Sequence, residues 1–464
     1  MNNDQDLLKN SVDTFAQKFN ASEFICSRYE NTERLILLSN GIDTKTTYFN
    51  DKGIGVTGIM DSYHNNNIIH GFTTDISQKG ISNLNMNKLH PHSTLTNDIN
   101  IKEKDIREIF HIDYDDIKNI LLDASKVIYN SDKYILQGYF RFEINMTNKY
   151  LLNSENFVYN DASNVRVCLG GWSRTKNNEI VCDGLVHLDK EGDYNYLFKK
   201  TDQIISSIVN RSLLKQSATK AISKKYPIVL APRASTLLIH EIVGHSLEAD
   251  FLLNTKKHFY GDKGFKIAPD EISVYDDPTI PFRYGSYEYD DDGRKSEKTT
   301  LIENGVLKNY LLNLHTSRII GEKFSGNGRA ESYHYPSYPR MSNTYLDIGE
   351  WKREDIISNI DEGIYIEYFP DAYADLNEGS FYLGSGEVFS IEKGEISASI
   401  KPIYIAGLNQ KILGKISAIG NDLTFCSGGS LCKKTTFHGL QKIPVDYGAP
   451  TILLDNIKIN LDND

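Results

Sequence analysis

Apolar residues recur at helical spacing in three stretches of the N-terminal half of the chain. This spacing predicts amphipathic helices over residues 6–19, 115–129 and 193–219, the last of which joins the two halves. Between these helices, apolar and polar residues alternate in short runs at 24–29, 35–38, 53–60, 134–146 and 157–169. A period of two is typical of half-buried strands, and Gly- and Asn-rich turns separate the runs. The first half therefore predicts helices with an antiparallel sheet.

The C-terminal half predicts one buried helix followed mainly by strands and turns. Residues 227–231 indicate a buried strand that runs into a helix over about 235–250. Apolar runs flank 304–305, an Asn-Gly pair of the kind found in hairpins whose two central residues take positive φ. Residues 392–394 predict a second hairpin in the same way. This half is therefore expected to be richer in strands than the first.

The whole pattern predicts an α+β fold. A chain of 464 residues is too long for one compact core, so several domains are expected. We divide it into an N-terminal α+β domain with a mostly antiparallel sheet (1–105), a central α+β segment (106–222) and a strand-rich C-terminal domain (223–464). Polar, poorly periodic residues at 61–68 and 82–104 predict loops.

Composition and charge exclude several classes of function. Hydrophobic residues make up 40% and charged residues 24%, as in ordinary globular proteins. The net charge of −11 argues against nucleic acid and anionic membranes as partners. No stretch approaches the ~20 apolar residues of a membrane span, and the N-terminus lacks the apolar run of a signal peptide. Five cysteines without disulfide-framework spacing favour a reducing, cytoplasmic setting.

Candidate chemistry concentrates in residues 237–250, LLIHEIVGHSLEAD. His240 and His245 offer imidazole nitrogens, which are common zinc ligands, and Glu241 offers a carboxylate that can take a proton from metal-activated water. The histidines are five residues apart, which on a regular helix separates their side chains by roughly 140°. They can bind one ion only if the helix ends, bulges or widens, and Gly244 permits such a distortion. A buried helix that happens to hold two histidines fits the spacing equally well.

A zinc site usually needs a third protein ligand. Glu248, three residues after His245, is one candidate, although it fits a helical ion pair at least as well. Cys426 and Cys432 are others; their separation of six does not match a zinc-ribbon pair, but a single thiolate can reach the helix from a loop. The remaining cysteines are interpreted as small buried hydrophobes: Cys26, Cys168 and Cys182.

HEIVGHSLEAD resembles the metal-site helix of the TldD/PmbA family of metallopeptidases, in its TldD-like branch. Further segments are similar to that family in the same order along the chain. They are DDGRKSEKTTLIENGVLKNYLLN (291–313), SGNGRAESYHYPSYPRMSNTYL (325–346), IKPIYIAGLNQKILGKISAIGNDL (400–423) and GLQKIPVDYGAPTILL (439–454), with a fainter N-terminal match in GIGVTGIM and HGFTTDIS. The resemblance covers most of residues 20–460 and is strong from 225 onward.

The resemblance implies a metallopeptidase domain with Zn²⁺ held by His240, His245 and a C-terminal cysteine, and with Glu241 as general base. The family cysteine precedes a Gly-Gln-x-x-Pro segment, here 439–444, which indicates Cys432. A longer intervening stretch, KKTTFH, leaves Cys426 open. A second departure lies at 371–383, where the family has a glycine-rich turn, and it affects the shape of the substrate cleft.

The resemblance further implies a peptidase that acts on unfolded or extended peptides. It also implies a dimer, with a second copy or with a TldE-like relative that lacks the metal motif. Two other functions stay open: a non-catalytic partner subunit, and a zinc hydrolase of a non-peptide bond. For stabilising the oxyanion of the reaction, a His or Tyr of the segment 332–338 is the candidate donor.

Overall fold

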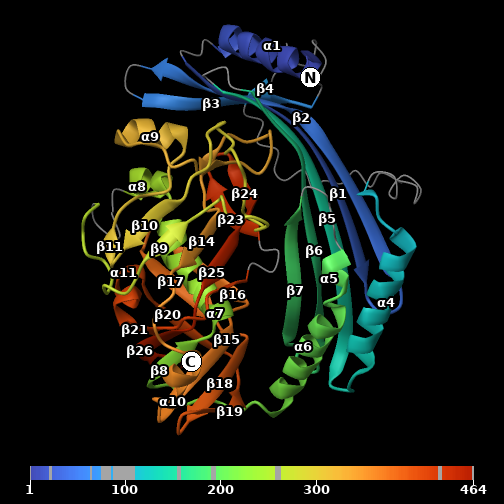
Figure 1. Cartoon of the computed structure of the whole chain (residues 1–464), viewed down its shortest axis with the longest axis vertical. Helices are drawn as coiled ribbons and strands as arrows, with labels where there is room; N and C mark the ends of the chain where they lie inside the picture. The colour runs from blue at the N-terminus through green and yellow to red at the C-terminus, as the bar shows by residue number, and fades with distance from the viewer. Residues whose placement is uncertain are drawn as a thin grey trace.

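The computed structural model describes residues 2–19, 23–62, 65–74, 85–86, 110–153, 158–189, 195–255, 263–426 and 431–461. A long, curved antiparallel sheet from the N-terminal half stands beside a strand-rich body formed by the C-terminal half (Figure 1). The predicted α+β class is confirmed. Within the described ranges, no helix combines the length and apolarity needed to span a bilayer.

The sheet has seven strands in the order β4-β3-β2-β1-β5-β6-β7. The elements of this half are α1 (Asn2–Phe19), β1 (Glu23–Ser39), β2 (Thr44–Ser62), β3 (Asn65–Thr73), β4 (Asn85–Met86), α4 (Tyr114–Asn130), β5 (Ile135–Asn153), β6 (Val158–Thr175), β7 (Ile180–Asp189), α5 (Asn195–Phe198) and α6 (Thr201–Leu214). Strands from both sides of residue 105 share this sheet, and the three-domain division stays a prediction.

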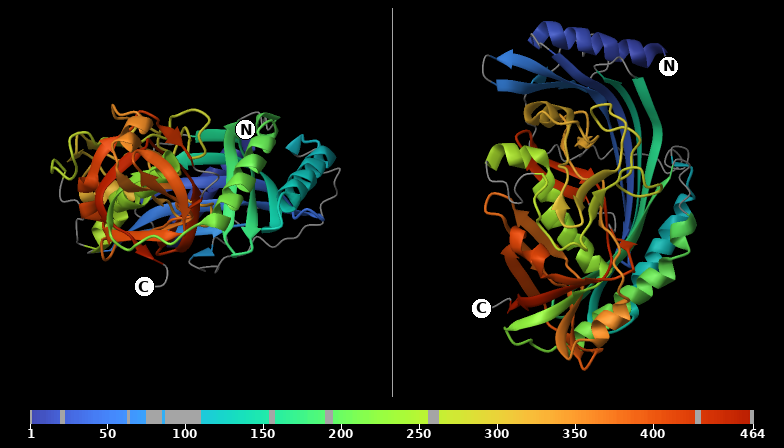
Figure 2. Two further views of the ribbon diagram at one scale, coloured as in Figure 1. Left: turned by 90° about the horizontal axis from the view of Figure 1, so that it is seen from below. Right: turned by 60° about the vertical axis from the view of Figure 1, so that its left-hand side comes forward.

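The two faces of β5 and β6 serve different purposes because successive side chains point to opposite sides of a strand. Phe140, Phe142 and Val167 pack against α4 and α6, which lie side by side (Figure 2). Arg141 and Cys168, on the opposite face, line a cavity against the C-terminal body. The sheet thus contributes one wall of that cavity.

The C-terminal body contains two six-stranded sheets, β11-β10-β9-β14-β25-β22 and β19-β18-β15-β8-β26-β21, a four-stranded sheet, β16-β17-β20-β27, and the two-stranded pairs β12-β13 and β23-β24. Its helices are α7 (Pro232–Ile239), α8 (Ala249–Thr255), α9 (Leu314–Ile320), α10 (Arg353–Ser358) and α11 (Asn409–Ile412). The main hydrophobic core lies here and includes the apolar residues of α7.

The strands of the body, in chain order, are β8 (Lys225–Leu230), β9 (Val274–Asp276), β10 (Thr299–Glu303), β11 (Val306–Leu307), β12 (Gly328–Arg329), β13 (Tyr338–Pro339), β14 (Asn343–Leu346), β15 (Glu362–Tyr368), β16 (Asp371–Asp375), β17 (Ser380–Gly384), β18 (Glu387–Glu392), β19 (Glu395–Ile400), β20 (Ile403–Leu408), β21 (Ile416–Ile419), β22 (Thr424–Phe425), β23 (Leu431–Thr436), β24 (Gly439–Pro444), β25 (Asp446–Ala449), β26 (Ile452–Lys458) and β27 (Asn460–Leu461). Both predicted hairpins are confirmed. Asn304 and Gly305 have φ of 48° and 72°, and Lys393 and Gly394 have φ of 53° and 82°.

Two predictions about the first half need correction, and a third falls mostly on residues that the structure does not describe. The helix expected over 193–219 is interrupted, with α5 and α6 separated at 199–200 and a 3₁₀ turn at 215–217. The predicted loop at 61–68 is largely strand, because backbone pairing of β2 with β3 continues to Ser62 and Asn65 whatever their polarity. Most of the predicted loop at 82–104 lies outside the described residues, apart from β4.

β1 is one long strand where the sequence predicted two short ones, because its polar middle pairs with both β2 and β5. Polar residues of this strand are also buried against the body. Arg28 is 1% exposed, and its guanidinium lies 3.8 Å from Glu30 and 3.6 Å from Asp291. Lys149 of β5 lies 3.4 Å from Glu30 and also contacts Asp291. We call Arg28, Glu30, Lys149 and Asp291 the joint cluster, since Asp291 belongs to the body and the others to the sheet.

A second contact between the halves lies near the other end of the sheet. Arg211 of α6 donates from Nε to Glu387 of β18 at 2.5 Å, and its Nη1 lies 3.3 Å from Asp183 of β7. Lys215 also donates to the carbonyl of Gly386. The two contacts hold the sheet against the body on either side of the cavity.

Candidate metal centre

The candidate site begins where β8 ends and α7 starts with Pro232 in its first turn, a position that suits proline because its missing N–H needs no helical partner. From His240 to Gly244 the helix widens into a π-helical turn, in which the N–H of His245 donates to the carbonyl of His240. A turn with hydrogen bonds five residues apart brings residues of that spacing to one face. The two imidazole rings are 4.9 Å apart between centroids. The helix thus widens where the histidine spacing requires it.

The backbone of Gly244 is in the ordinary right-handed helical region, so its conformation does not itself require glycine. The reason for glycine at this position is steric. A Cβ added there would lie 2.0 Å from the sulfur of Met341. Met341 is fully buried and packs directly on the widened turn. The close approach of Met341 therefore disfavours a larger side chain at 244.

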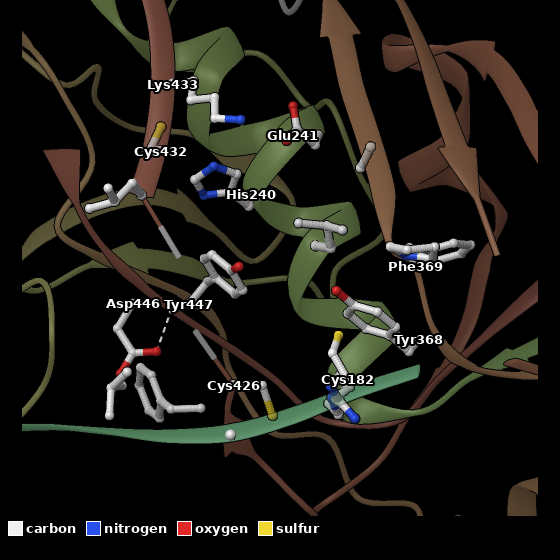
Figure 3. A pocket seen from close by; sticks show the side chains of 18 of the residues that line it. Cys182, His240, Glu241, Tyr368, Phe369, Cys426, Cys432, Lys433, Asp446 and Tyr447 are labelled. Atoms are coloured by element: carbon white, nitrogen blue, oxygen red, sulfur yellow. Dashed lines mark hydrogen bonds between the residues drawn. The ribbon is translucent and has the colours of Figure 1, made fainter. Parts of the chain in front are cut away.

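The structure brings His240, His245 and Cys432 together. One ligand atom from each lies within 4.8 Å of the others, and all three residues are buried. The Cys432 sulfur, on β23, is 3.3 Å from Nε2 of His245. Cys426 lines the same cavity but is not in this group, and Figure 3 shows it at the other end of the helix stretch. Of the two cysteines considered from sequence, Cys432 is the one near the histidines.

Glu241 lies beside this group and also faces the cavity (Figure 3). The backbone N–H of Ala374, in β16, donates to its carboxylate. Burial raises the pKa of Glu241, and the neighbouring charges of His245 and His240 only partly offset this effect. A carboxylate with a raised pKa is a better proton acceptor at neutral pH than an exposed one.

The charges of His245 and Cys432 support each other. Burial opposes ionisation of the Cys432 thiol, but the charges of His245 and Arg340 outweigh it and hold its pKa well below the usual value. Burial likewise disfavours the charged His245, but Cys432 and Glu248 raise its pKa well above the usual value. The geometry therefore favours a thiolate at 432, which is the form that binds metal.

Glu248 lies behind His245 and points away from the cavity. Its Oε2 is 3.1 Å from Nδ1 of His245, which leaves Nε2 facing Cys432. Lys434 lies 2.9 Å from Glu248 and 2.7 Å from Asp250, and Arg340 lies 3.5 Å from Glu248. We call Glu248, Asp250, Arg340 and Lys434 the rear cluster. Glu248 thus occupies the ion-pair position that the sequence left open as an alternative to ligation.

The rear cluster ties the ligand-bearing segments to each other. Lys434 is two residues after Cys432 on β23, and Arg340 donates from Nη2 to the carbonyl of Cys432 at 2.7 Å. Because Glu248 is on the helix side and contacts both cations, it links β23 to the segment that carries His245. No local pattern indicated this role for Arg340 or Lys434, since each is distant along the chain from the histidine motif.

The residues present fit a zinc-type ion. Two imidazoles and a thiolate are a donor set that such ions favour over the oxygen-rich sites of Mg²⁺ and Ca²⁺. Nδ1 of His240 is buried and has no hydrogen-bond partner among the described residues, as expected of a nitrogen reserved for another ligand. The cavity lies on the open side of the group, where a fourth ligand could enter.

The cavity has a volume of about 1480 Å³ and is lined by both halves of the chain. Its walls include β6 and β7 of the sheet, β16 and β23 of the body, and the cavity-facing side of α7. The segment 332–338 does not line it. Tyr333 instead donates its hydroxyl to Asp51 of β2 at 2.7 Å, and His334 lies 3.6 Å from the same carboxylate. The oxyanion donor expected from this segment therefore stays a prediction, which the lining of the cavity does not support.

Known proteins are similar to this chain in sequence and in fold. Residues 223–461, more than half of the 464, match the family described as PmbA/TldA metallopeptidase C-terminal domain. "Metalloprotease TldD homolog" of Buchnera aphidicola subsp. Acyrthosiphon pisum is 36% identical over 275 residues, 58% of this chain and 56% of that protein. "Zinc metalloprotease TldD homolog" of Saccharolobus solfataricus is 29% identical over 308 residues, 61% of this chain and 67% of that protein.

A solved structure extends the similarity to the whole fold. TldE from Thermococcus kodakarensis superposes with a TM-score of 0.70 at 18% identity, over 97% of this chain and 100% of that one. At this identity the match shows a common fold alone. In sequence, the chain spans about half the length of the curated relatives that it matches.

Proposed function

The chain belongs to the PmbA/TldD metallopeptidase family, and on this premise we propose that it is a zinc-dependent peptidase acting on unfolded or extended peptides. The observation that carries the proposal is the convergence of two imidazoles and one thiol within 4.8 Å, beside Glu241 and facing a cavity. Relatives named as metalloproteases, one of them as a zinc metalloprotease, support it.

Each residue has a distinct role in this proposal. His240, His245 and Cys432 hold the zinc ion through two nitrogens and one sulfur. When bound, zinc supplies Lewis acidity, which lowers the pKa of water and polarises a carbonyl. Glu241 accepts a proton from the attacking water on its carboxylate and delivers it to the leaving amine. The N–H of Ala374 holds that carboxylate toward the cavity. Hydrolysis breaks the C–N bond and consumes one water.

The proposed substrate is an extended peptide because an edge strand adjoins Glu241. β16 pairs with β17 and, among the described strands, has no partner on its other side. Ala372, Ala374 and Asp375 of β16 line the cavity. A peptide added to this edge would be bound through its backbone, with little dependence on sequence.

We also propose that the chain forms a dimer, with a second copy or with a TldE-like chain, as the resemblance implies. Sedimentation of the purified chain, alone and with a TldE-like relative, separates these two forms. A cytoplasmic setting stays a prediction from the cysteine content.

The first experiment is metal analysis of the purified wild type, His240→Ala and Cys432→Ser, with Cys426→Ser as the matched control. We expect about one zinc per chain in the wild type, loss in His240→Ala, weaker binding in Cys432→Ser and no change in Cys426→Ser. Glu241→Gln should keep the zinc and lose cleavage of an unstructured fluorogenic peptide.

Other results would redirect the proposal. Zinc that depends on Cys426 and not on Cys432 would change the third ligand. A wild type that neither contains zinc after chelator-free purification nor takes it up on titration would favour the non-catalytic partner subunit. Zinc-dependent cleavage of small esters with no cleavage of peptides would favour hydrolysis of a non-peptide bond.

A further inference from the structure

The cavity contains a cation that pairs with no carboxylate of the residues that the structure describes. Among the Arg and Lys side chains that line it, Arg141, Arg283 and Lys434 each form an ion pair. Lys433 is exposed beside Cys432 on β23. Arg233, in the first turn of α7, is half-buried and has no carboxylate partner within the described part of the chain. A guanidinium in a cavity without a counter-ion is suited to bind an anionic ligand.

The Arg233 side chain is held in place without using its hydrogen-bond donors. Its guanidinium lies 4.5 Å from the centroid of the Tyr368 ring. Tyr368 in turn lies near Cys182 of β7, which raises the pKa of its hydroxyl in addition to the larger effect of burial, so the surroundings of Arg233 come from both the body and the sheet. Stacking occupies the face of the guanidinium and leaves the in-plane N–H groups available. Such a fork matches the geometry of a carboxylate, which it can bind through two parallel hydrogen bonds.

Arg233 lies on the same face of the helix as the candidate metal centre. Arg233, Leu237 and Glu241 are spaced by four residues, and all three line the cavity. Figure 3 shows Tyr368 and Cys182 at one end of this helix stretch and His240 and Glu241 at the other. With 1.5 Å of rise per residue, Arg233 precedes His240 by about 10 Å along the axis. This length corresponds to about three residues of extended peptide.

We infer that Arg233 binds the C-terminal carboxylate of a peptide substrate, so that the chain acts as a carboxypeptidase that releases short C-terminal peptides. This inference rests on the proposed peptidase function and adds the direction in which the peptide lies. With its carboxylate on Arg233, a peptide extended along the helix face places a bond about two or three residues from its C-terminus beside Glu241. The opposite direction would put an ammonium group against the guanidinium.

An acidic side chain within the peptide carries the same carboxylate group as its C-terminus and could bind Arg233 in the same way. Cleavage is ordinary hydrolysis in both cases: water adds OH to the carbonyl carbon and a proton to the departing nitrogen. A C-terminal carboxylate fixes the cleaved bond relative to the chain end, whereas an acidic side chain fixes it relative to that side chain. Peptides that differ only in these groups distinguish the two.

The test uses unstructured peptides of one sequence in three forms: a free C-terminal acid, a C-terminal amide, and an amide with one glutamate near its C-terminus. We expect the wild type to cleave the acid about tenfold to hundredfold more efficiently than the plain amide, the range of a hydrogen-bonded charge. Mass spectrometry should identify a released C-terminal di- or tripeptide. Arg233→Gln should lose this preference through slower cleavage of the acid alone, with zinc content unchanged.

Two further variants test whether the preference for the acid depends on the charge of Arg233, on its planar shape and on its position in the cavity. Arg233→Lys keeps the charge but not the planar fork, so it should restore only part of the preference for the acid. Arg283→Gln removes a cavity cation that is already paired with Asp446, and the ratio of acid to amide cleavage should stay at the wild-type value. An equal loss of preference in Arg283→Gln would assign it to the general charge of the cavity and overturn the inference.

The outcomes distinguish this inference from the proposed function. Equal cleavage of acid and amide by the wild type would overturn the inferred binding of the C-terminal carboxylate by Arg233. The proposed peptidase function would still stand. An Arg233-dependent preference for the glutamate amide, equal to that for the acid, would assign the subsite to acidic side chains. If no peptide is cleaved, the proposed function fails. Fluorescence anisotropy with the labelled acid and amide still tests whether Arg233 binds the C-terminal carboxylate, and equal binding of those two peptides would overturn that inference.

Discussion

The joint cluster and the rear cluster each bury two acidic and two basic residues, but they hold different parts together. In the joint cluster, Arg28 and Lys149 of the sheet contact Asp291 of the body, so the charges join the two halves. In the rear cluster all four charges belong to the body, and they contact His245 and the carbonyl of Cys432. Buried ion pairs of the same composition therefore serve docking in one place and ligand orientation in the other.

The largest expected effect comes from breaking the joint cluster with Arg28→Met. Arg28 also donates to the carbonyls of Ser332 and Tyr335. Its loss leaves Lys149 as the remaining cation of the joint cluster beside Asp291 and Glu30. Removing one partner from buried charges costs about 3–5 kcal/mol of unfolding free energy. Urea denaturation measures this loss, and zinc affinity of the folded chain should not change.

Lys323→Met is the matched control for Arg28→Met. Lys323 pairs with Glu297 at 3.1 Å, and both side chains are at least half exposed. Exposed pairs contribute roughly 0–1 kcal/mol, so this variant should unfold close to the wild type. A fall in zinc affinity in Arg28→Met as large as any produced by the rear cluster would remove the contrast between the two clusters.

Gly244→Ala tests whether packing, besides charge, fixes the metal centre. The new methyl group would overlap the Met341 sulfur, and overpacking of this kind costs about 1–3 kcal/mol. Gly414→Ala is the control, because nothing lies within 4 Å of a Cβ at that position. Thermal unfolding and zinc titration of both variants give the comparison.

A second substitution makes the Gly244 test specific. Met341→Ala should restore part of the stability that Gly244→Ala loses, since it removes the atom in conflict, and the two effects should be clearly non-additive. Simple addition of the two losses would mean that Met341 is not what excludes a side chain at 244.

Glu248→Gln should act on metal binding more than on docking of the two halves. It replaces the carboxylate behind Nδ1 of His245 by an amide, which holds the imidazole less firmly in the tautomer that presents Nε2. Loss of such a supporting contact lowers metal affinity about tenfold to hundredfold. Competition with a chromophoric chelator measures the affinity, and the absorption spectrum of the Co²⁺-loaded variant reports ligand geometry. Unchanged zinc affinity would reduce the rear cluster to a structural role.

The two clusters also mark what the sequence could and could not predict. From the five-residue spacing, His240 and His245 could share one ion only if the helix ended, bulged or widened between them, and the structure shows a widened turn there. Cys432 and Cys426 were both candidates for the third ligand from their residue type. The preference for Cys432 came only from the family resemblance, since nothing local ties it to residues almost two hundred positions earlier. Arg340 and Lys434 were missed for the same reason, since both lie far along the chain from the histidines.

The first half was harder to predict because its sheet buries polar residues. Polar residues at 30–34, among them Glu30, interrupt the apolar alternation of β1, and the sequence reads as two short strands, 24–29 and 35–38, on either side of them. The burial of Arg28 depends on Asp291, which lies far along the chain, so no local pattern signals it. The apolar faces of α1 and α4 have no such dependence, and both helices were predicted close to their observed bounds.

The smallest expected effect is a dependence of stability on pH that arises from His70, which lies between the sheet and the body. Its ring nitrogens contact Thr57 Oγ1 and the carbonyl of Tyr333, each at 2.9 Å, and so tie the sheet to the body. Burial and then the charge of Arg28 hold the pKa of His70 well below its usual value, with His438 and His334 acting in the same direction. In the folded chain His70 therefore stays neutral at pH values where it would be charged in the unfolded chain.

The sign follows from proton binding. Below the ordinary histidine pKa of about 6.5 the unfolded chain binds a proton that the folded chain excludes, so stability is full above that pH and falls as pH decreases. The slope from one such group is at most about 1.4 kcal/mol per pH unit. Urea denaturation of the wild type and of His70→Gln at a series of pH values isolates it, because other titrating groups are common to both. Parallel curves would show that His70 does not make the joint sensitive to acid, and would leave docking to the ion pairs of the joint cluster.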